Sequence, residues 1–451
     1  VIFWTDSLIP EKIISLSNKN AERIKTSSMN LEQIMNLMIA KYQEGKKVIR
    51  LHDGDPCLFG AINEQIIILK KENIKAEVIP GISAFQITAA YHQAELTIPE
   101  VTQTIILSRY KYAPMESFDK AAAWLYNGMG EAFDENTARM AIAGDDPMLL
   151  SNQDPEKVGR ANKANSIAYK PARERITQFN INWNIISWPG RAWAMRMFPK
   201  LPADEAQAKL AAAIFSASRV DNDDPVKAWE EHNKVLKKRS DWLNERNFYS
   251  LHFKGRNTDL TVGLAQNHEW MGGASKSENG VICNPNIPSE EVFTTPHALK
   301  VNGTVCSTKP LSHQGSLIDN ICVRFENGKI VDAKASKGQE VLLKVLDTDE
   351  GARRLGEVAL VPDSSPISQS GLLFYNTLFD ENAASHIALG QCYSKCFKSE
   401  VNLSEAEVKA RGGNSSMIHI DWMIGSNEID VDGISESGER TPVFRKGEWS
   451  R

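Results

Sequence analysis

The sequence lacks any long apolar run. No stretch of 18 or more consecutive apolar residues occurs among its 451 residues, whereas a transmembrane helix needs about 20. We therefore predict that the chain does not span a membrane. It also lacks a long run of Lys and Arg. Basic and acidic residues nearly balance over the whole chain, with 52 Lys and Arg, 57 Asp and Glu, and a net charge of −5. Nucleic acid and anionic membrane surfaces are thus not the expected partners.

Cysteine is also scarce. None of the six cysteines belongs to a Cys-x-x-Cys pair; they are Cys57, Cys283, Cys306, Cys322, Cys392 and Cys396. This density is typical of a reducing cytoplasm rather than of a disulfide scaffold, and it disfavours a thiolate zinc site. We therefore predict a cytoplasmic protein, and we expect Cys392 and Cys396 to share a helix.

The first 109 residues have an α/β texture. No signal peptide opens the chain; VIFWTDSLIP starts it as a strand with its exit turn, so we expect a piece of a longer sequence. The strands VIFW, KKVIRL, AEVIP and TQTIILSR alternate with three helices, and the first of these is SSMNLEQIMNLMIAKYQEG. This alternation predicts βαβ units and a parallel sheet.

The rest of the chain has a different texture. Residues 110–246 are helix-rich, as in AAAWLYNGMGEAF, and residues 247–451 are strand-rich, as in FYSLHFKG, TDLTVGL and ICVRFENGKIVDAKAS. A chain of this length usually forms more than one core. We predict an α/β fold, α+β overall, with three domains: a partial parallel-sheet segment at 1–109, a helix-rich α/β region at 110–246 and a strand-rich α+β domain at 247–451.

A glycine-containing loop follows the strand VIRL directly. In HDGDPCLFG, Gly54 permits close backbone approach, and Asp55 can cap the next helix with Pro56 at its first position. VIPGISAF repeats this pattern, with Ser83 as a possible cap. In open α/β sheets, ligands bind at such loops after parallel strands. Two ordinary helix starts without a ligand are the alternative.

These motifs resemble the tetrapyrrole methylase family, in particular the precorrin-4 methyltransferases of cobalamin synthesis. WTDSL, KTSSMNLEQI, RLHDGDPCLFGAI and VIPGISAFQITAA carry the resemblance over residues 1–109. It implies that Gly54, Asp55 and Pro56 help to hold S-adenosylmethionine. The family's opening Gly-Pro-Gly loop and second domain have no counterpart here, so the resemblance implies a truncated segment that binds this cofactor weakly or not at all.

Acidic and histidine residues further along are candidate metal ligands. No HExxH helix occurs, so a metal site must combine separated elements. In SMIHIDWMIGS, His419 and Asp421 project from one strand face, where burial is costly without a cation; a solvated sheet face is the alternative. Glu357 lies within the apolar LGEVALVP, and Glu290 and Glu291 precede a short strand. The alternatives for these glutamates are an exposed strand position and a solvated loop.

TLFDENAASHIALGQCY predicts a helix that carries Asp380, Glu381, His386 and Tyr393. His386 and Tyr393 are seven residues apart, so they share one helix face, which Gly390 leaves open. Packing of His386 within a core is the alternative to metal binding.

Together these clusters resemble aminopeptidase T and related bacterial metallo-aminopeptidases. NPNIPSEEVFTTPH, LDTDEGARRLGEVALVP, LFDENAASHIALGQCY and RGGNSSMIHIDWMIGS carry the resemblance, which runs from about residue 112 to the C-terminus. It implies peptide substrates, a homodimer, two divalent ions (zinc, cobalt or magnesium) and a bridging water as nucleophile. The implied metal ligands are Glu291, Glu357, Glu381, His386, His419 and Asp421. Glu357 is the implied bridging carboxylate, and Tyr393 would stabilise the reacting carbonyl oxygen.

The two resemblances meet near residue 110, where methylase-like sequence replaces the first α/β portion of the aminopeptidases. We predict a chimeric chain whose complete site is that of a metal-dependent aminopeptidase. Methylation of a corrin precursor with S-adenosylmethionine is the alternative reaction. A chimera that keeps the motifs without activity is the alternative that is not an enzyme.

Overall fold

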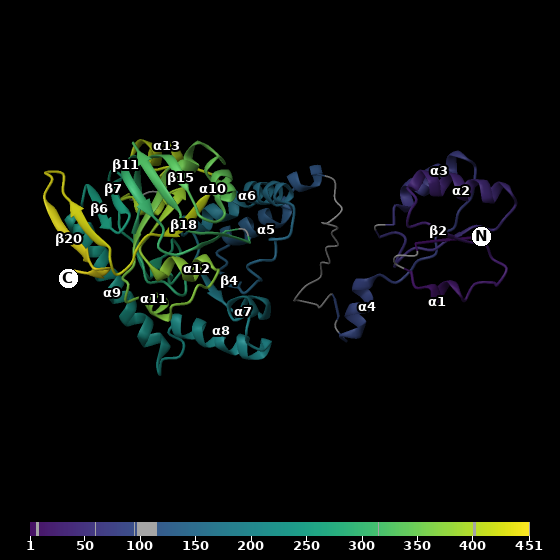
Figure 1. The fold of residues 1–451 in the computed structure, drawn as a ribbon, viewed down its shortest axis with the longest axis horizontal. Coiled ribbons are helices and arrows are strands. Elements are labelled where there is room, and N and C mark those ends of the chain that lie inside the picture. Colours follow the sequence, from purple (N-terminus) through teal and green to yellow (C-terminus); the bar gives the residue numbers. More distant parts are fainter. Residues whose placement is uncertain are drawn as a thin grey trace. The chain divides into compact units, whose positions relative to one another are not determined.

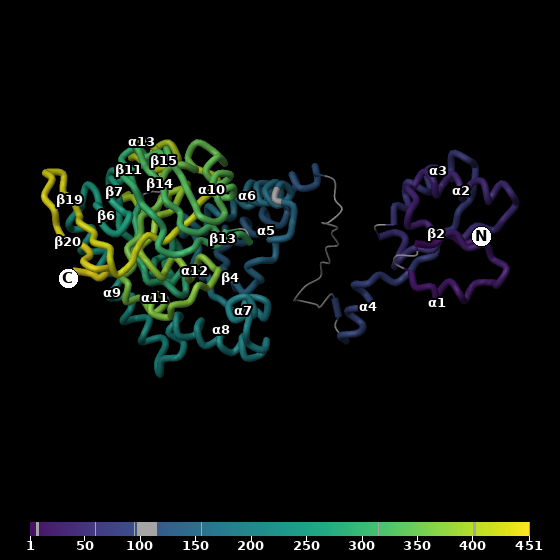
Figure 2. Tube along the Cα trace, viewed as in Figure 1, coloured from purple at the N-terminus to yellow at the C-terminus, as the bar shows by residue number. Residues whose placement is uncertain are grey.

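The chain forms two compact units. The computed structural model describes residues 1–5, 9–58, 60–93, 95–96, 115–313, 315–399 and 403–450. Contacts divide the chain into Val1–Pro114 and Met115–Arg451, and Figures 1 and 2 colour both units along the sequence. Within the described ranges, no helix combines the length and apolar character that crossing a membrane requires. The division of the second unit near residue 246 stays a prediction.

The first unit is built on a small parallel sheet. Its strand order is β2-β1-β3, with β1 (Ile2–Trp4) parallel to both β2 (Arg23–Lys25) and β3 (Ile49–Arg50). Asn30 caps the longest helix by accepting a hydrogen bond from the Gln33 N–H at 2.9 Å. The predicted parallel sheet and helices are confirmed. The helices are α1 Glu11–Ile14, α2 Leu31–Gln43, α3 Ile62–Lys71 and α4 Ala84–Tyr91.

Three local predictions in this unit have other outcomes. The strand predicted at residues 76–80 (AEVIP) is wrong, because these residues pair with no described strand. TQTIILSR lies outside the described residues. Helix α3 begins at Ile62 and not at Pro56, because the Asp55 carboxylate accepts hydrogen bonds from the N–H groups of Cys57 and Gly81 and does not cap a helix.

The second unit starts with helices, as predicted. Strands β4 (Arg139–Ala143) and β5 (Trp183–Ser187) form a parallel pair among them. Trp193 donates its indole N–H to the carbonyl of Phe374 at 2.6 Å and packs in one core with Leu210. The early helices are thereby joined to the later part of the unit. They are η1 Met115–Asp119, α5 Ala123–Asp134, α6 Pro155–Thr177, α7 Arg191–Met197, α8 Ala203–Ala217 and α9 Pro225–Arg246.

Two antiparallel sheets follow, which confirms the strand-rich prediction. The larger sheet has the order β15-β14-β11-β7-β6-β19-β20-β21, and the smaller has the order β10-β16-β17-β18. The larger sheet comprises β6 Ser250–Gly255, β7 Thr258–Leu264, β11 Pro296–Cys306, β14 Cys322–Glu326, β15 Lys329–Lys334, β19 Asp430–Ile434, β20 Arg440–Arg445 and β21 Glu448–Trp449. The smaller comprises β10 Val292–Thr294, β16 Leu355–Leu360, β17 His386–Gly390 and β18 His419–Met423.

Short elements complete the second unit. Two antiparallel pairs are formed by β8 with β9 and by β12 with β13. Their bounds, and those of the later helices, are β8 Ser275–Lys276, β9 Ile282–Cys283, β12 Leu311–His313, β13 Ser316–Ile318, α10 Gln339–Leu346, η2 Glu350–Arg353, α11 Pro366–Ser370, α12 Thr377–Asp380, η3 Glu381–Ala383, η4 Ser394–Cys396 and α13 Glu405–Ala410.

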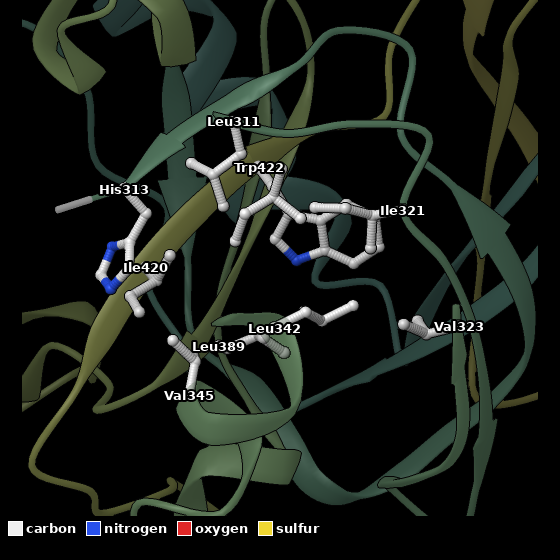
Figure 3. Close-up of a pocket in the computed structure, with 10 residues that line it drawn as sticks. Leu311, His313, Ile321, Val323, Leu342, Val345, Leu389, Ile420 and Trp422 are labelled. Carbon is white, nitrogen blue, oxygen red and sulfur yellow. The ribbon is translucent and has the colours of Figure 1, made fainter. Parts of the chain in front are cut away.

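The main core includes one face of the smaller sheet. Ile387 and Trp422 of this sheet belong to the same buried cluster as Phe253 of the larger sheet. Trp422 also lines a small apolar cavity with Leu389 and with Leu342 of α10, as Figure 3 shows. Because this face is apolar, the polar residues of the same strands must lie on the opposite face.

The cysteines depart from the sequence-based expectation at two places. Cys306 and Cys322 lie opposite each other on β11 and β14 and form a disulfide. Cysteine density did not predict this bond, because only the strand register brings the two residues together. The helix expected for Cys392 and Cys396 is wrong, since Cys392 follows β17 and Cys396 ends the short helix η4. Both of these thiols are buried and free.

Candidate metal centre

The polar residues of the smaller sheet gather on one face. In β18, His419 and Asp421 alternate with apolar residues and therefore project to the same side. The strand register pairs Asp421 with Ala388 of β17, and Ala388 with Glu357 of β16. Glu357 and Asp421 thus share a face, with only a methyl group on the strand between them.

Glu291 and His386 reach this face from neighbouring strands. Glu291 directly precedes β10, and His386 opens β17. The helix predicted from Asp380 to Tyr393 is therefore wrong, because only Thr377–Ala383 is helical. All five residues of β17 are buried, and the strand pairs on both sides with β16 and β18. This pairing outweighs the weak helical pattern of the sequence.

Glu357 lies at the centre of the cluster. Its Oε1 is 3.8 Å from Nε2 of His386, and its Oε2 is 3.3 Å from Nε2 of His419. Glu291 Oε2 lies 3.0 Å from the same nitrogen of His386, and Asp421 Oδ1 lies 3.6 Å from that of His419. The side chains form two groups of possible ligands, each with its atoms within 4.8 Å of one another, and Glu357 belongs to both.

Backbone carbonyls orient both imidazole rings. His386 Nδ1 lies 3.1 Å from the carbonyl oxygen of Ala384, and His419 Nδ1 lies 2.7 Å from that of Gln391. Because a carbonyl oxygen only accepts, each Nδ1 carries a proton, and in the neutral ring the Nε2 lone pair points toward the carboxylates. Metal-binding histidines commonly have this arrangement.

The cluster holds more carboxyl groups than imidazoles. Glu291 Oε2 and Asp421 Oδ1 are buried and make no hydrogen bond; the contact of Glu291 with His386 is therefore an ion pair only. Burial raises the pKa of both carboxyls, and nearby Glu357 adds to the rise. Carboxylate oxygens and imidazole nitrogens are the donors that divalent cations such as zinc take in proteins, so these residues fit a metal site.

The central carboxylate differs from its neighbours. Burial acts to raise the pKa of Glu357, but His386 and His419 outweigh it and lower this pKa to about 2. Burial acts to lower the pKa of His419, but Asp421 and Glu357 raise it to about 9. For His386 the contacts with Glu291 and Glu357 likewise outweigh burial and raise the pKa well above its usual value. Glu357 is therefore the carboxylate that stays ionised.

The cluster lines a cleft, and Glu381 and Tyr393 line this cleft as well. Glu381 belongs to neither group of three ligands, but desolvation and the charge of Asp421 raise its pKa well above the usual value. The Tyr393 ring lies 4.8 Å from that of His419. Burial and Glu357 raise the pKa of Tyr393 well above its usual value, so its hydroxyl stays protonated and can donate a hydrogen bond.

Two further acidic residues named from the sequence lie outside the cluster. Glu290 forms an ion pair with Arg219 at 2.6 Å. Asp380 is buried and accepts hydrogen bonds from the N–H groups of Phe374 and Asn376 at 2.7 and 3.0 Å, and burial raises its pKa to about 7. Asp380 thus stabilises the backbone of the loop at residues 374–376.

The cleft has an apolar wall that sequence reasoning missed. Besides the polar cluster, the cleft is lined by Ile176, Phe179, Trp183, Met271 and Phe293. In the sequence these residues occupy apolar positions like those of any core, so no local signal distinguishes them.

The loop of the first unit is formed as a turn. Gly54 has a φ of +72°, which favours glycine. Gly81 packs so closely that an added Cβ would lie 2.3 Å from the carbonyl oxygen of Gly54. The two predicted loops therefore meet, while the cofactor role of Gly54, Asp55 and Pro56 stays a prediction.

Comparison with known proteins identifies the family. Residues 61–449 match the family described as thermophilic metalloprotease (M29). The chain belongs to this M29 family. It is 54% identical to aminopeptidase T of Thermus thermophilus over 347 residues, which are 77% of this chain and 85% of that protein. It is 44% identical to aminopeptidase 2 of Geobacillus stearothermophilus over 342 residues, 76% of this chain and 83% of that protein.

A solved structure agrees with the M29 assignment. Wild-type AmpT from Thermus thermophilus superposes with a TM-score of 0.72 at 46% identity, covering 87% of this chain and 92% of that one. The M29 chain is thus a metal-dependent aminopeptidase, a hydrolase, as predicted.

Part of the chain is also similar to methyltransferases. The chain is 47% identical to the cobalt-precorrin-4 C(11)-methyltransferase of Methanocaldococcus jannaschii over 109 residues, which are 24% of this chain and 42% of that protein. The Priestia megaterium enzyme of the same name is 42% identical over 121 residues, 27% of this chain and 47% of that protein. Both resemblances drawn from the sequence are confirmed.

Proposed function

We propose that the M29 chain removes N-terminal residues from peptides with two divalent ions, held by Glu291, Glu357, Glu381, His386, His419 and Asp421. The observation that carries this proposal is the position of Glu357. Its two oxygens face two different histidines, each of which has a carboxylate partner of its own. A carboxylate that bridges two ions needs this arrangement. Zinc, cobalt and magnesium are the candidate ions.

The residues around the ions divide the remaining work. Bound divalent ions supply Lewis acidity, which polarises the scissile carbonyl and lowers the pKa of a bridging water. Tyr393 is protonated, and its ring lies tilted beside that of His419. Its hydroxyl donates a hydrogen bond to the carbonyl oxygen as negative charge develops there. Glu357, which stays ionised, links the two ligand groups because its two oxygens face different histidines.

The cleft also bears on which peptides bind. Two divalent ions balance the four carboxylates among the proposed ligands, so the apolar part of the cleft is left to distinguish one peptide from another. The side chain of the first residue then packs against the apolar wall, where Met271 and Phe293 lie. We therefore propose a preference for peptides whose first side chain is apolar.

The test is hydrolysis of a leucyl chromogenic substrate with cobalt or zinc added. Exhaustive chelation is expected to abolish turnover, and the metal is expected to restore it. Glu357→Gln is expected to be inactive and to retain less metal, whereas Glu428→Gln, on the exposed surface, serves as the control. Full activity after chelation would refute the metal assignment.

The first unit is assigned no reaction of its own. The match covers 42% of the methyltransferase relative from Methanocaldococcus jannaschii. Calorimetry with S-adenosylmethionine is expected to show no tight binding. From the aminopeptidase resemblance we further propose a homodimer that acts in the cytoplasm. Sedimentation of the purified chain measures its oligomeric state.

A further inference from the structure

A buried ion pair anchors the residue before Glu291. Glu290 pairs with Arg219, which follows helix α8, with Nη1 and Oε1 2.6 Å apart and side-chain exposures of 15% and 5%. The two atoms are not aligned for a hydrogen bond, so the pairing is one of charge. The guanidinium also lies over the Trp229 ring, with its Cζ 5.4 Å from the ring centroid. Removing one partner of such a pair leaves a buried charge uncompensated, so the pair holds Glu290 in place.

A second contact fixes the backbone one residue earlier. His232 of α9 lies with Nδ1 3.2 Å from Nη2 of Arg219 and with Nε2 2.7 Å from the carbonyl oxygen of Ser289. Because arginine only donates, His232 Nδ1 accepts, and Nε2 therefore carries the proton that it donates to Ser289. The guanidinium thus acts on the side chain of Glu290 directly and on the backbone of Ser289 through an imidazole.

A third contact joins two ligand-bearing segments. The N–H of Glu290 donates to Asn382 Oδ1 at 2.6 Å. Asn382 is fully buried, and two further hydrogen bonds hold it in place. Its Nδ2 donates to the backbone carbonyl of Leu378, and its own backbone carbonyl accepts from Ser365 Oγ at 2.6 Å. This bond connects the residue before Glu291 with the residue after Glu381.

We propose that Arg219, His232 and Asn382 are positioning residues that hold Glu291 and Glu381 at the separation a two-metal site needs. This inference rests on the proposed function. Three anchors on two consecutive residues leave the backbone that leads into Glu291 little freedom. Ligands held in place in this way bind metal more tightly, because less ordering remains to be done on binding.

The test measures metal affinity separately from folding. Cobalt is titrated into the metal-free full-length chain by calorimetry, and the bound metal is counted by atomic emission. Asn382→Ala is expected to bind cobalt about 10- to 100-fold more weakly, the range typical of groups that orient ligands. Asn382→Asp keeps an acceptor for the Glu290 N–H, and in its protonated form it can still donate to the Leu378 carbonyl, so it is expected to recover part of that affinity.

The ion pair is tested with both charges removed together. Arg219→Met with Glu290→Gln keeps the side-chain volumes and leaves no buried charge, and it is expected to weaken cobalt binding to a similar extent. Should this double variant fail to fold, Arg219→Lys keeps the charge pair but cannot also bond His232, and it is expected to show a several-fold loss. Arg353→Met is the control, because its pair with Asp347 at 2.7 Å lies at the surface.

The outcomes separate this inference from the function on which it rests. Unchanged cobalt affinity in the folded Asn382 and Arg219 variants, with only the melting temperature of the metal-free chain lowered, would overturn the positioning role. Cobalt binding by His386→Ala that equals binding by the parent would instead overturn the metal centre itself.

Discussion

Replacing Asp421 by asparagine distinguishes a metal centre from a structural salt bridge. Asp421 is 7% exposed, its Oδ1 has no hydrogen-bond partner, and His419 Nε2 lies 3.6 Å away. Burial raises its pKa, and Glu357 adds to the rise. A carboxyl whose pKa is higher in the folded state destabilises that state once pH rises above the unfolded pKa. Without metal, Asp421→Asn should therefore melt no lower than the parent at neutral pH.

With metal the sign reverses. Zinc at about 100 times its dissociation constant stabilises the folded parent by about 2.7 kcal/mol. Loss of a ligand that weakens binding about 100-fold leaves roughly 0.4 kcal/mol at the same zinc concentration. The variant should thus lose about 2 kcal/mol of this stabilisation.

The assay is thermal unfolding of parent and variant, in zinc and in chelator. Asp332→Asn is the control, because that strand aspartate is half-exposed beside Lys334, and it should leave both melts unchanged. An equal loss of stability for Asp421→Asn in zinc and in chelator would refute the reasoning, since a structural salt bridge contributes under both conditions.

Three further variants test other parts of the molecule. Tyr393→Phe should lower kcat by about 10²- to 10³-fold with unchanged metal content, because it removes one hydrogen bond to the developing oxyanion; an unchanged kcat in steady-state assays would contradict that role. Met271→Ala should lower the ratio of leucyl to alanyl kcat/KM by about tenfold, and a constant ratio would exclude this wall from specificity. His268 is buried, and burial lowers its pKa to about 4 from 6.5. Since the unfolded chain takes up this proton first, the parent should lose about 2 kcal/mol more stability than His268→Gln between pH 7 and pH 5, measured by urea unfolding in chelator; equal losses would contradict the shift.

The local pattern of the chain predicts part of the site well. His419 and Asp421 alternate with apolar residues, and alternation is a property of the strand itself. Glu357 stands out for a related reason, because a lone carboxylate in an apolar run needs a cation or water. Both signals lie within a few residues of sequence, so they are readable without knowledge of the fold.

His386 shows where such reasoning fails. Its segment has apolar residues that suit either a helix or a buried strand, and a short run does not decide between them. The decision comes from β16 and β18, which hydrogen-bond to both edges of β17. Those strands lie about 30 residues away on either side, beyond the reach of any local pattern.

The residues around the metal ligands raise the same difficulty in stronger form. All six proposed ligands lie between Glu291 and Asp421, in the part of the chain where aminopeptidase motifs are continuous. His232 lies in helix α9 and Ile176 of the apolar wall in helix α6, and Arg219 directly follows helix α8. A change in residues 115–246 can therefore alter metal affinity and substrate preference while every ligand motif stays intact. In this chain, motifs identify the chemistry, and the packing of the preceding helices sets how well it operates.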